Sequence, residues 1–389
     1  MKEFRGLRHI ADARNHGVKQ KLGSVRDNSG RLQTSGQGVV DAFAEFYAQL
    51  YASRREPGGE QRRKKGKETE LQRIEPAEVA KHLRKMANRK AADTKGVVVE
   101  MLKYGGQGLT RLLADLFNDV LRGDQTPPAT WKETRLTVLF KKGDAKCLEN
   151  YRPVAILPIV YKLFSRILDA RIRTHIAHEQ SVDQAAFRPG FGCVDHLFTL
   201  AQLNEKSAEW NLDFWVAAVD FRKAFDCVEH DALWAAMEEL GAPGVYIRVL
   251  ERLYEGQQAK VGGDKVSKPF PIKRGTKQGD PVSPTLFNAV VEVMMRRLKS
   301  KWQRKRYGFD MEFGDPRRLQ NLRFADDLML FGRTLPQVAA MLGDLGEEAA
   351  KMGLEIHFGK TKILSNATNR RGVSAAREVN VAGNKVEVL

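Results

Sequence analysis

Two adjacent carboxylates, Asp326 and Asp327, interrupt a stretch from Leu322 to Phe331 that is apolar apart from Arg323. Apolar residues on both sides of a short polar segment predict a β-hairpin whose turn carries the acids. Neighbouring carboxylates in a partly buried turn repel each other, and a bound cation or proton uptake relieves that repulsion. The hairpin therefore predicts a divalent-metal site or, as the simpler alternative, an acidic turn that faces solvent.

A third acid, Asp220, follows the apolar segment 214–219. A carboxylate that leaves a buried strand lies where ligands bind, although a lone Asp there is more often a turn former or helix cap. Mg²⁺ is typically held by one or two carboxylates together with substrate phosphates. If the strands of Asp220 and Asp326 are neighbours in one sheet, two metal ions would stabilise both oxygens of a phosphoryl displacement. This chemistry is typical of polymerases and nucleases.

The charge balance favours a polyanionic partner. Lys and Arg number 65 against 48 Asp and Glu in 389 residues, a formal charge of +17. Nucleic acid is the partner that such a balance suggests, with solubility as the alternative explanation. The cysteines, Cys147, Cys193 and Cys227, form no CxxC pair, which argues against a disulfide framework and a structural zinc site. No segment is long and apolar enough to span a bilayer, so we expect a soluble intracellular protein without a membrane partner.

Hydrophobic periodicity predicts an α+β fold. Helices are expected over residues 35–51, from Pro76, over 107–122, after Pro158, over 230–240, after Asp280 and over 337–352, and strands over 136–140, over 214–221 and around Asp326. Asp280 and Pro281 suit the N-cap and first turn of their helix. The basic run 62–67 indicates a solvated linker, with nucleic-acid contact or nuclear import as hypotheses. The basic tract 296–306, which contains Trp302, indicates either a template contact or an exposed helix end.

Several ordered motifs resemble those of the reverse transcriptases of non-LTR (LINE-type) retrotransposons. The segments that resemble the palm motifs are 220–226, 274–284, 324–327 and 353–354 with 360–362, and those that resemble the fingers motifs are 139–144, 150–153 and 187–190. The sequence departs from the family pattern at residues 90–96 and at Ala186, where a Gly is usual.

The resemblance implies a right-hand polymerase fold of fingers and palm, with an antiparallel palm sheet packed on helices. It divides the chain into an N-terminal extension with a helix and a basic linker (1–70), fingers (71–205) and a palm (206–389). The palm is expected to end in a primer-grip hairpin around residues 382–385, with no thumb after it.

The resemblance also implies an RNA-directed DNA polymerase that uses Mg²⁺ or Mn²⁺ to add deoxynucleotides to a DNA primer on an RNA template. Its implied metal site comprises Asp220, Phe221, Asp326 and Asp327, with Lys360 as candidate general acid. Its implied nucleotide site comprises Phe221, Phe225, Gln278, Gly279, Arg152 and either Lys141 or Lys142. Phe225 matches the steric gate that excludes a ribose 2′-hydroxyl, and an aromatic there can equally pack in the core.

Two other functions remain open. Because the chain ends within the predicted primer-grip hairpin, it can be a catalytically silent nucleic-acid-binding remnant of such an element. The same acids could serve a metal-dependent nuclease, although Phe225 and the loop of Gln278 and Gly279 have no evident use there. The oligomeric state and template specificity do not follow from the sequence.

Overall fold

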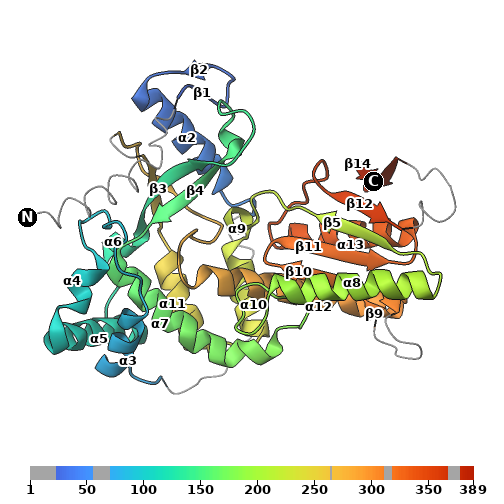
Figure 1. Ribbon diagram of the computed structural model, residues 1–389. Coiled ribbons are helices and arrows are strands. Elements are labelled where there is room, and N and C mark those ends of the chain that lie inside the picture. The colour runs from blue at the N-terminus through green and yellow to red at the C-terminus, as the bar shows by residue number, and fades with distance from the viewer. Residues whose placement is uncertain (1–22, 56–70, 263–264, 311–317, 367–376) are drawn as a thin grey trace, which may run out of the picture.

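The computed structural model describes residues 23–55, 71–262, 265–310, 318–366 and 377–389, so the basic run 62–67 lies outside the described residues. Two larger sheets dominate the fold, one of four strands in the order β4-β3-β6-β7 and one of six in the order β10-β11-β5-β12-β14-β13. Helices pack around both sheets (Figure 1). The predicted α+β class is confirmed.

The N-terminal part is a short hairpin followed by a helix. Its elements are β1 (Val25–Arg26), β2 (Leu32–Gln33) and α2 (Gly36–Leu50). The Ser35 side chain caps α2 by accepting a hydrogen bond from the Gly38 backbone N–H at 3.0 Å. Phe43 and Tyr47 on this helix are fully buried. The amphipathic helix predicted over 35–51 is therefore present, and its apolar stripe faces the core.

The four-stranded sheet joins segments that are far apart in the sequence. Its strands are β3 (Glu133–Phe140), β4 (Tyr151–Ile156), β6 (Gln258–Val261) and β7 (Phe270–Pro271). β3 pairs antiparallel with β4 and parallel with β6. The accompanying helical elements are α3 (Pro76–Arg84), α4 (Val99–Lys103), α5 (Gly106–Arg122), α6 (Ala129–Lys132), η1 (Leu148–Asn150), α7 (Ile159–Ile176) and η2 (Ala177–Glu179).

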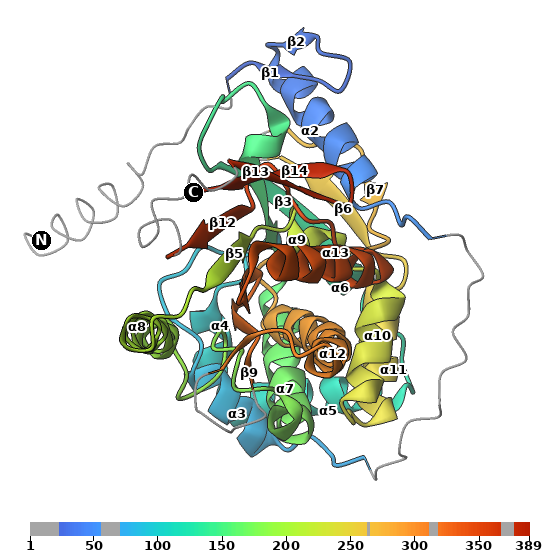
Figure 2. The ribbon, with the colours of Figure 1, turned by 90° about the vertical axis from the view of Figure 1, so that its right-hand side faces the viewer.

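The six-stranded sheet has a central strand that is covered on both faces. Its strands are β5 (Trp215–Val219), β10 (Asn321–Phe324), β11 (Asp327–Gly332), β12 (Lys362–Ser365), β13 (Glu378–Val381) and β14 (Asn384–Val388). Side chains on one face of β5 pack beneath α13 (Leu335–Lys351), and Val216 on the other face packs with Leu203 of α8 (Cys193–Glu209). Figure 2 shows α8 and α13 on opposite sides of β5. Burial on both faces explains why β5 is almost entirely apolar.

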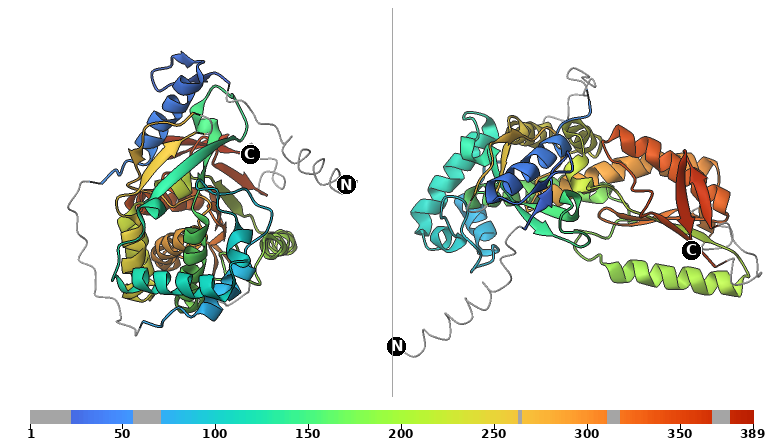
Figure 3. Two further views of the ribbon diagram at one scale, coloured as in Figure 1. Left: turned by 90° about the vertical axis from the view of Figure 1, so that its left-hand side faces the viewer. Right: turned by 90° about the horizontal axis from the view of Figure 1, so that it is seen from above.

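The remaining elements are α9 (Ala224–Cys227), α10 (His230–Glu239), α11 (Gly244–Tyr254), α12 (Ser283–Arg304), β8 (Phe309–Asp310) and β9 (Arg318–Leu319). Seen from above, α8 and the six-stranded sheet lie at the end of the molecule opposite α3, α4 and α5 (Figure 3). Residues 382–383 form the turn between β13 and β14, as the predicted hairpin requires. No helix in the described part of the chain combines the length and apolarity needed to cross a membrane.

The start of α12 differs from the prediction. Val282 is the N-cap and Pro284 lies in the first turn, so Asp280 and Pro281 precede the helix. The Asp280 carboxylate is buried and accepts hydrogen bonds from the hydroxyls of Tyr161 and Ser165 on α7, besides a longer one of 3.4 Å from the Val282 backbone N–H. A buried carboxylate requires such donors, and a contact between α7 and the start of α12 is invisible to local capping rules.

The structure also contradicts part of one of the two interpretations of the basic tract 296–306. Trp302 is fully buried, and its ring N–H donates to Asp344 on α13 at 3.0 Å. Cations of the same tract pair with acids of this chain, among them Arg296, Arg297, Lys299 and Lys301. Because its ring is buried, Trp302 is not available to stack on a template base, and that part of the template-contact hypothesis is wrong. A template contact through the cations of the tract stays a hypothesis.

Candidate active site

The strand register brings the three predicted acids to one end of the six-stranded sheet. β11 pairs antiparallel with β5, with Leu328 opposite Val219. Asp327 directly precedes Leu328, and Asp220 directly follows Val219. The hairpin partner β10 ends at Phe324, which leaves Ala325 and Asp326 in the turn. The strands that carry Asp220 and the acid pair are therefore neighbours, as the predicted two-metal chemistry requires.

The three carboxylates lie close enough to influence one another. Partial burial raises the pKa of Asp326, and the negative charges of Asp327 and Asp220 add to the increase, while a backbone hydrogen bond opposes it. The Lys360 ammonium lies 3.8 Å from a carboxylate oxygen of Asp220, and both side chains are open to solvent. Lys360 thus reaches the same end of the sheet from the loop that precedes β12.

These acids fit a metal ion that substrate helps to hold. Among the described residues, no group of three or more His, Cys, Asp or Glu side chains is arranged to hold a metal ion by itself. Mg²⁺ needs only one or two protein carboxylates when substrate phosphates and water complete its shell. Like charges gathered at one sheet end, with oxygen as the only donor type, suit a hard divalent cation.

Gln184, which the sequence motifs did not single out as a functional residue, clamps the acidic turn. Ala325 has a φ of 58°, in the left-handed region that non-glycine residues rarely adopt. The buried side-chain oxygen of Gln184 accepts hydrogen bonds from the backbone N–H groups of Ala325 and Ala186, each at 3.0 Å. The backbone N–H of Ala185 donates to the Arg323 carbonyl at 3.0 Å. Only the tertiary structure reveals this clamp, because nothing in local periodicity marks a buried glutamine.

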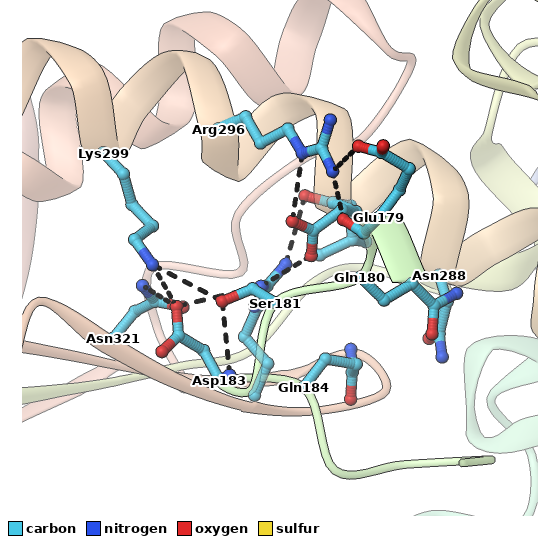
Figure 4. A network of polar contacts seen from close by, with 12 residues as sticks. Glu179, Gln180, Ser181, Asp183, Gln184, Asn288, Arg296, Lys299 and Asn321 are labelled. Atoms are coloured by element: carbon cyan, nitrogen blue, oxygen red, sulfur yellow. Dashed lines mark hydrogen bonds and ion pairs between the residues drawn. The ribbon is translucent and has the colours of Figure 1, made fainter. Parts of the chain in front are cut away.

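An ionic network ties the same hairpin to α12. The Arg323 guanidinium on β10 lies 2.9 Å from a carboxylate oxygen of Glu292, and both side chains are almost completely buried. Figure 4 shows Arg296 and Lys299, also on α12, reaching toward Glu179 and Asp183 in the segment that leads to Gln184. The hairpin that carries the acidic turn is therefore held by contacts with both α12 and residues 179–186.

A cleft of about 1760 Å³ opens beside the acids. The predicted site residues that line it are Lys141, Lys142, Arg152, Asp220, Phe221, Phe225, Gln278, Gly279, Asp326 and Lys360. Asp327 is exposed and is not among the lining residues, although it adjoins Asp326 in the turn. The cleft thus places carboxylates, cations and an aromatic ring around one volume, which suits a phosphorylated ligand with its counter-ions.

Phe225 and the loop that leads to Gln278 contact each other in the lining of the cleft. The Phe225 ring stacks on Phe287 with centroids 4.1 Å apart and planes 20° apart, so it is also a packing residue. The backbone N–H of Thr276 donates to the Phe225 carbonyl at 2.6 Å. Gly275, with a φ of 84°, passes so close to Asp226 that a Cβ would lie 2.5 Å from the Asp226 carbonyl oxygen. The loop before Gln278 therefore requires glycine at this position to lie against α9.

The chain matches a known protein family over more than half of its length. The family described as "Reverse transcriptase (RNA-dependent DNA polymerase)" matches residues 140–386. Similar proteins include the Pol polyprotein of the type-2 retrotransposable element R2DM of Drosophila melanogaster, 28% identical over 60% of this chain and 21% of that protein. Another is the Pol polyprotein of the type-1 retrotransposable element R2 of Popillia japonica, 31% identical over 62% of this chain and 33% of that protein.

The chain thus spans between about a fifth and a third of the length of these relatives. Among solved structures, apo telomerase from Candida tropicalis resembles 72% of this chain and 59% of that chain, with a TM-score of 0.45 and 12% identity.

Proposed function

Because the chain belongs to the reverse transcriptase family and is related to the polyproteins of non-LTR retrotransposons, we propose that it is an RNA-directed DNA polymerase. It would add deoxynucleotides to a DNA primer on an RNA template. The observation that supports this proposal most directly is the pairing of β5 with β11, which sets Asp220 beside the acidic turn at the edge of the cleft. In this proposal, residues 71–205 are the fingers and 206–389 the palm.

Each site residue has a role that its position supports. Asp220, Asp326 and Asp327 would hold Mg²⁺ or Mn²⁺, and Phe221, whose side chain is buried, would contribute only through its backbone. When bound, such ions activate the attacking hydroxyl and neutralise charge on the phosphate oxygens. Arg152 with Lys141 or Lys142 would bind the triphosphate, because cations match its negative oxygens. Lys360, beside Asp220, would donate a proton to the departing pyrophosphate.

The activity is tested by extension of a labelled DNA primer on an RNA template with all four dNTPs. We expect extension with Mg²⁺ or Mn²⁺ and none with excess EDTA. If the folded chain binds the primer-template without extending it, the chain is instead a silent nucleic-acid-binding remnant. Metal-dependent shortening of the labelled strand, in place of extension, would indicate a nuclease.

Phe225 provides a further prediction about sugar selection. Its ring lines the cleft against the backing of Phe287, so it can occupy the space that a ribose 2′-hydroxyl needs. The variant Phe225→Val should incorporate ribonucleotides about 10-fold to 100-fold more efficiently relative to deoxynucleotides, because the clash is removed. The ratio of kcat/KM for rNTP and dNTP in single-nucleotide insertion measures this change. An unchanged ratio in a variant that still extends with dNTPs would leave Phe225 with a packing role alone.

A further inference from the structure

A buried carboxylate links the end of α2 to Gln278 in the lining of the cleft. Asp226 on α9 is almost completely buried. One of its oxygens accepts a hydrogen bond from the Tyr51 hydroxyl at 2.9 Å. The other oxygen accepts one from the side-chain amide of Gln278 at 2.8 Å. The three side chains therefore form a continuous chain of hydrogen bonds that ends at the cleft.

Tyr51 is held in place by its backbone as well as by its ring. Its carbonyl accepts a hydrogen bond from the Lys273 backbone N–H at 2.9 Å, and the carbonyl of Leu50 accepts one from the Arg274 guanidinium at 2.7 Å. Both donors belong to the loop that leads into Gln278. Tyr51 precedes residue 140, where the match to the family begins, so family resemblance does not assign it a role.

The chain of hydrogen bonds determines which end of the Gln278 amide faces the cleft. An ionised carboxylate has no hydrogen to donate, so the amide group of Gln278 that meets Asp226 must be its NH₂. The amide oxygen is then left to accept a hydrogen bond from a ligand. Among the groups that all four deoxynucleotides share, the 3′-hydroxyl is the donor, because the phosphates offer acceptors.

The charge on Asp226 is maintained by its surroundings. Burial raises the pKa of Asp226 to about 6, and the hydrogen bond from Tyr51, the charge of Lys223, the hydrogen bond from Gln278 and the charge of Arg152 oppose that increase. Tyr51 makes the largest of these opposing contributions. If the Tyr51 hydroxyl is removed, one buried carboxylate oxygen of Asp226 loses its hydrogen-bond donor. The pKa of Asp226 then rises further, and a protonated Asp226 is a weaker acceptor for the Gln278 amide.

We propose that Tyr51 is a positioning residue of the nucleotide site, which acts through Asp226 to orient Gln278 toward the incoming deoxynucleotide. The inference rests on the proposed polymerase function. If Tyr51 has this role, a segment that precedes the part of the chain matched to the family contributes to substrate recognition.

The test compares Tyr51→Phe with Tyr47→Phe in single-nucleotide insertion. Both substitutions remove one hydroxyl from a buried ring of the same segment, but the Tyr47 hydroxyl contacts the Tyr151 carbonyl, at 3.4 Å. In Tyr51→Phe we expect KM for dNTP to rise about fivefold to tenfold with kcat changed less than about twofold. This is less than the loss of a whole charged hydrogen bond would cause, because Tyr51 acts on the nucleotide only through Asp226 and Gln278. KM for a 2′,3′-dideoxynucleotide should change less, because it lacks the hydroxyl that Gln278 would contact. Tyr47→Phe should behave as the parent does.

A second pair of variants separates positioning from a general loss of stability. If Tyr51 acts through Gln278, adding Tyr51→Phe to a Gln278→Leu chain should leave KM unchanged, whereas independent effects would add. Equal KM values for Tyr51→Phe and Tyr47→Phe, or a full additional effect in the Gln278→Leu chain, would overturn the inference. Those results require a parent that extends primers, so they are distinguishable from a failure of the proposed function, in which the parent itself is inactive.

Discussion

Replacing Asp326 by Asn is expected to lower kcat for primer extension by about 1000-fold or more. The amide keeps the shape of the carboxylate but removes the charge that would hold a divalent ion against the substrate phosphates, and electrostatic contributions of this kind are among the largest in catalysis. Asp326 lines the cleft within the turn that Gln184 clamps, so Asn should retain the local backbone. Single-turnover extension at saturating dNTP and primer-template measures the change.

The matched control is Asp115→Asn on α5. Asp115 is exposed, pairs with Arg73 at the surface and does not line the cleft, so this variant should extend primers as the parent does. Thermal unfolding in EDTA provides the second control. Burial and neighbouring acids raise the pKa of Asp326, which means that its ionised form destabilises the folded chain at neutral pH. The melting temperature of Asp326→Asn should therefore be no lower than that of the parent. Retention of more than a tenth of the parental rate would exclude Asp326 as a metal ligand.

The second large effect is expected on stability. Glu292→Met should reduce the free energy of unfolding by about 3–5 kcal/mol, because it removes the nearest carboxylate from the buried Arg323 guanidinium and leaves only the Asp183 carboxylate, 4.0 Å away. The guanidinium lies 2.9 Å from Glu292, and the exposed fraction of the Arg323 side chain is 1%. The Arg323 Nε already has no hydrogen-bond partner among the described residues, so removing the Glu292 carboxylate leaves a further buried N–H group unsatisfied. Urea unfolding followed by circular dichroism measures this free energy.

Glu239→Met is the comparison variant for this measurement. Glu239 pairs with Arg297 of α12 at 2.7 Å, and both of these side chains are nearly half exposed. Surface ion pairs of this kind contribute about 0–1 kcal/mol, so the urea concentration at the midpoint of unfolding should change little. Similar losses in the two variants would show that the Arg323 ion pair does not support the hairpin. Because Arg323 belongs to the strand that leads into the acidic turn, the Glu292 variant should also lose activity at temperatures below its unfolding transition.

Much of the secondary structure could be predicted because its signals are local. The apolar spacing of 35–51, the proline at 76 and the apolar run before Asp220 each correspond to an element that the structure contains. The elements not predicted, such as α8 and the strands β6 and β7, have weaker local signals. α8 leaves Val194, Leu197 and Phe198 exposed, so its apolar residues do not mark one buried stripe. β6 owes its place to the parallel pairing with β3, a contact across a long stretch of chain.

The candidate site divides in the same way. The sequence by itself determined the chemical groups, because the order of Asp220, Gln278 and the Asp326-Asp327 pair and the residues around them are typical of one family. It did not determine which carboxylates are neighbours, since strand order depends on pairing between segments that local preference cannot specify. Only the tertiary structure pairs β11 with β5, brings the Gln184 side chain against the acidic turn, and connects Tyr51 to Gln278 through Asp226. Buried polar groups need partners, and in a folded chain these partners come from whichever segments packing brings close, whatever their distance in sequence.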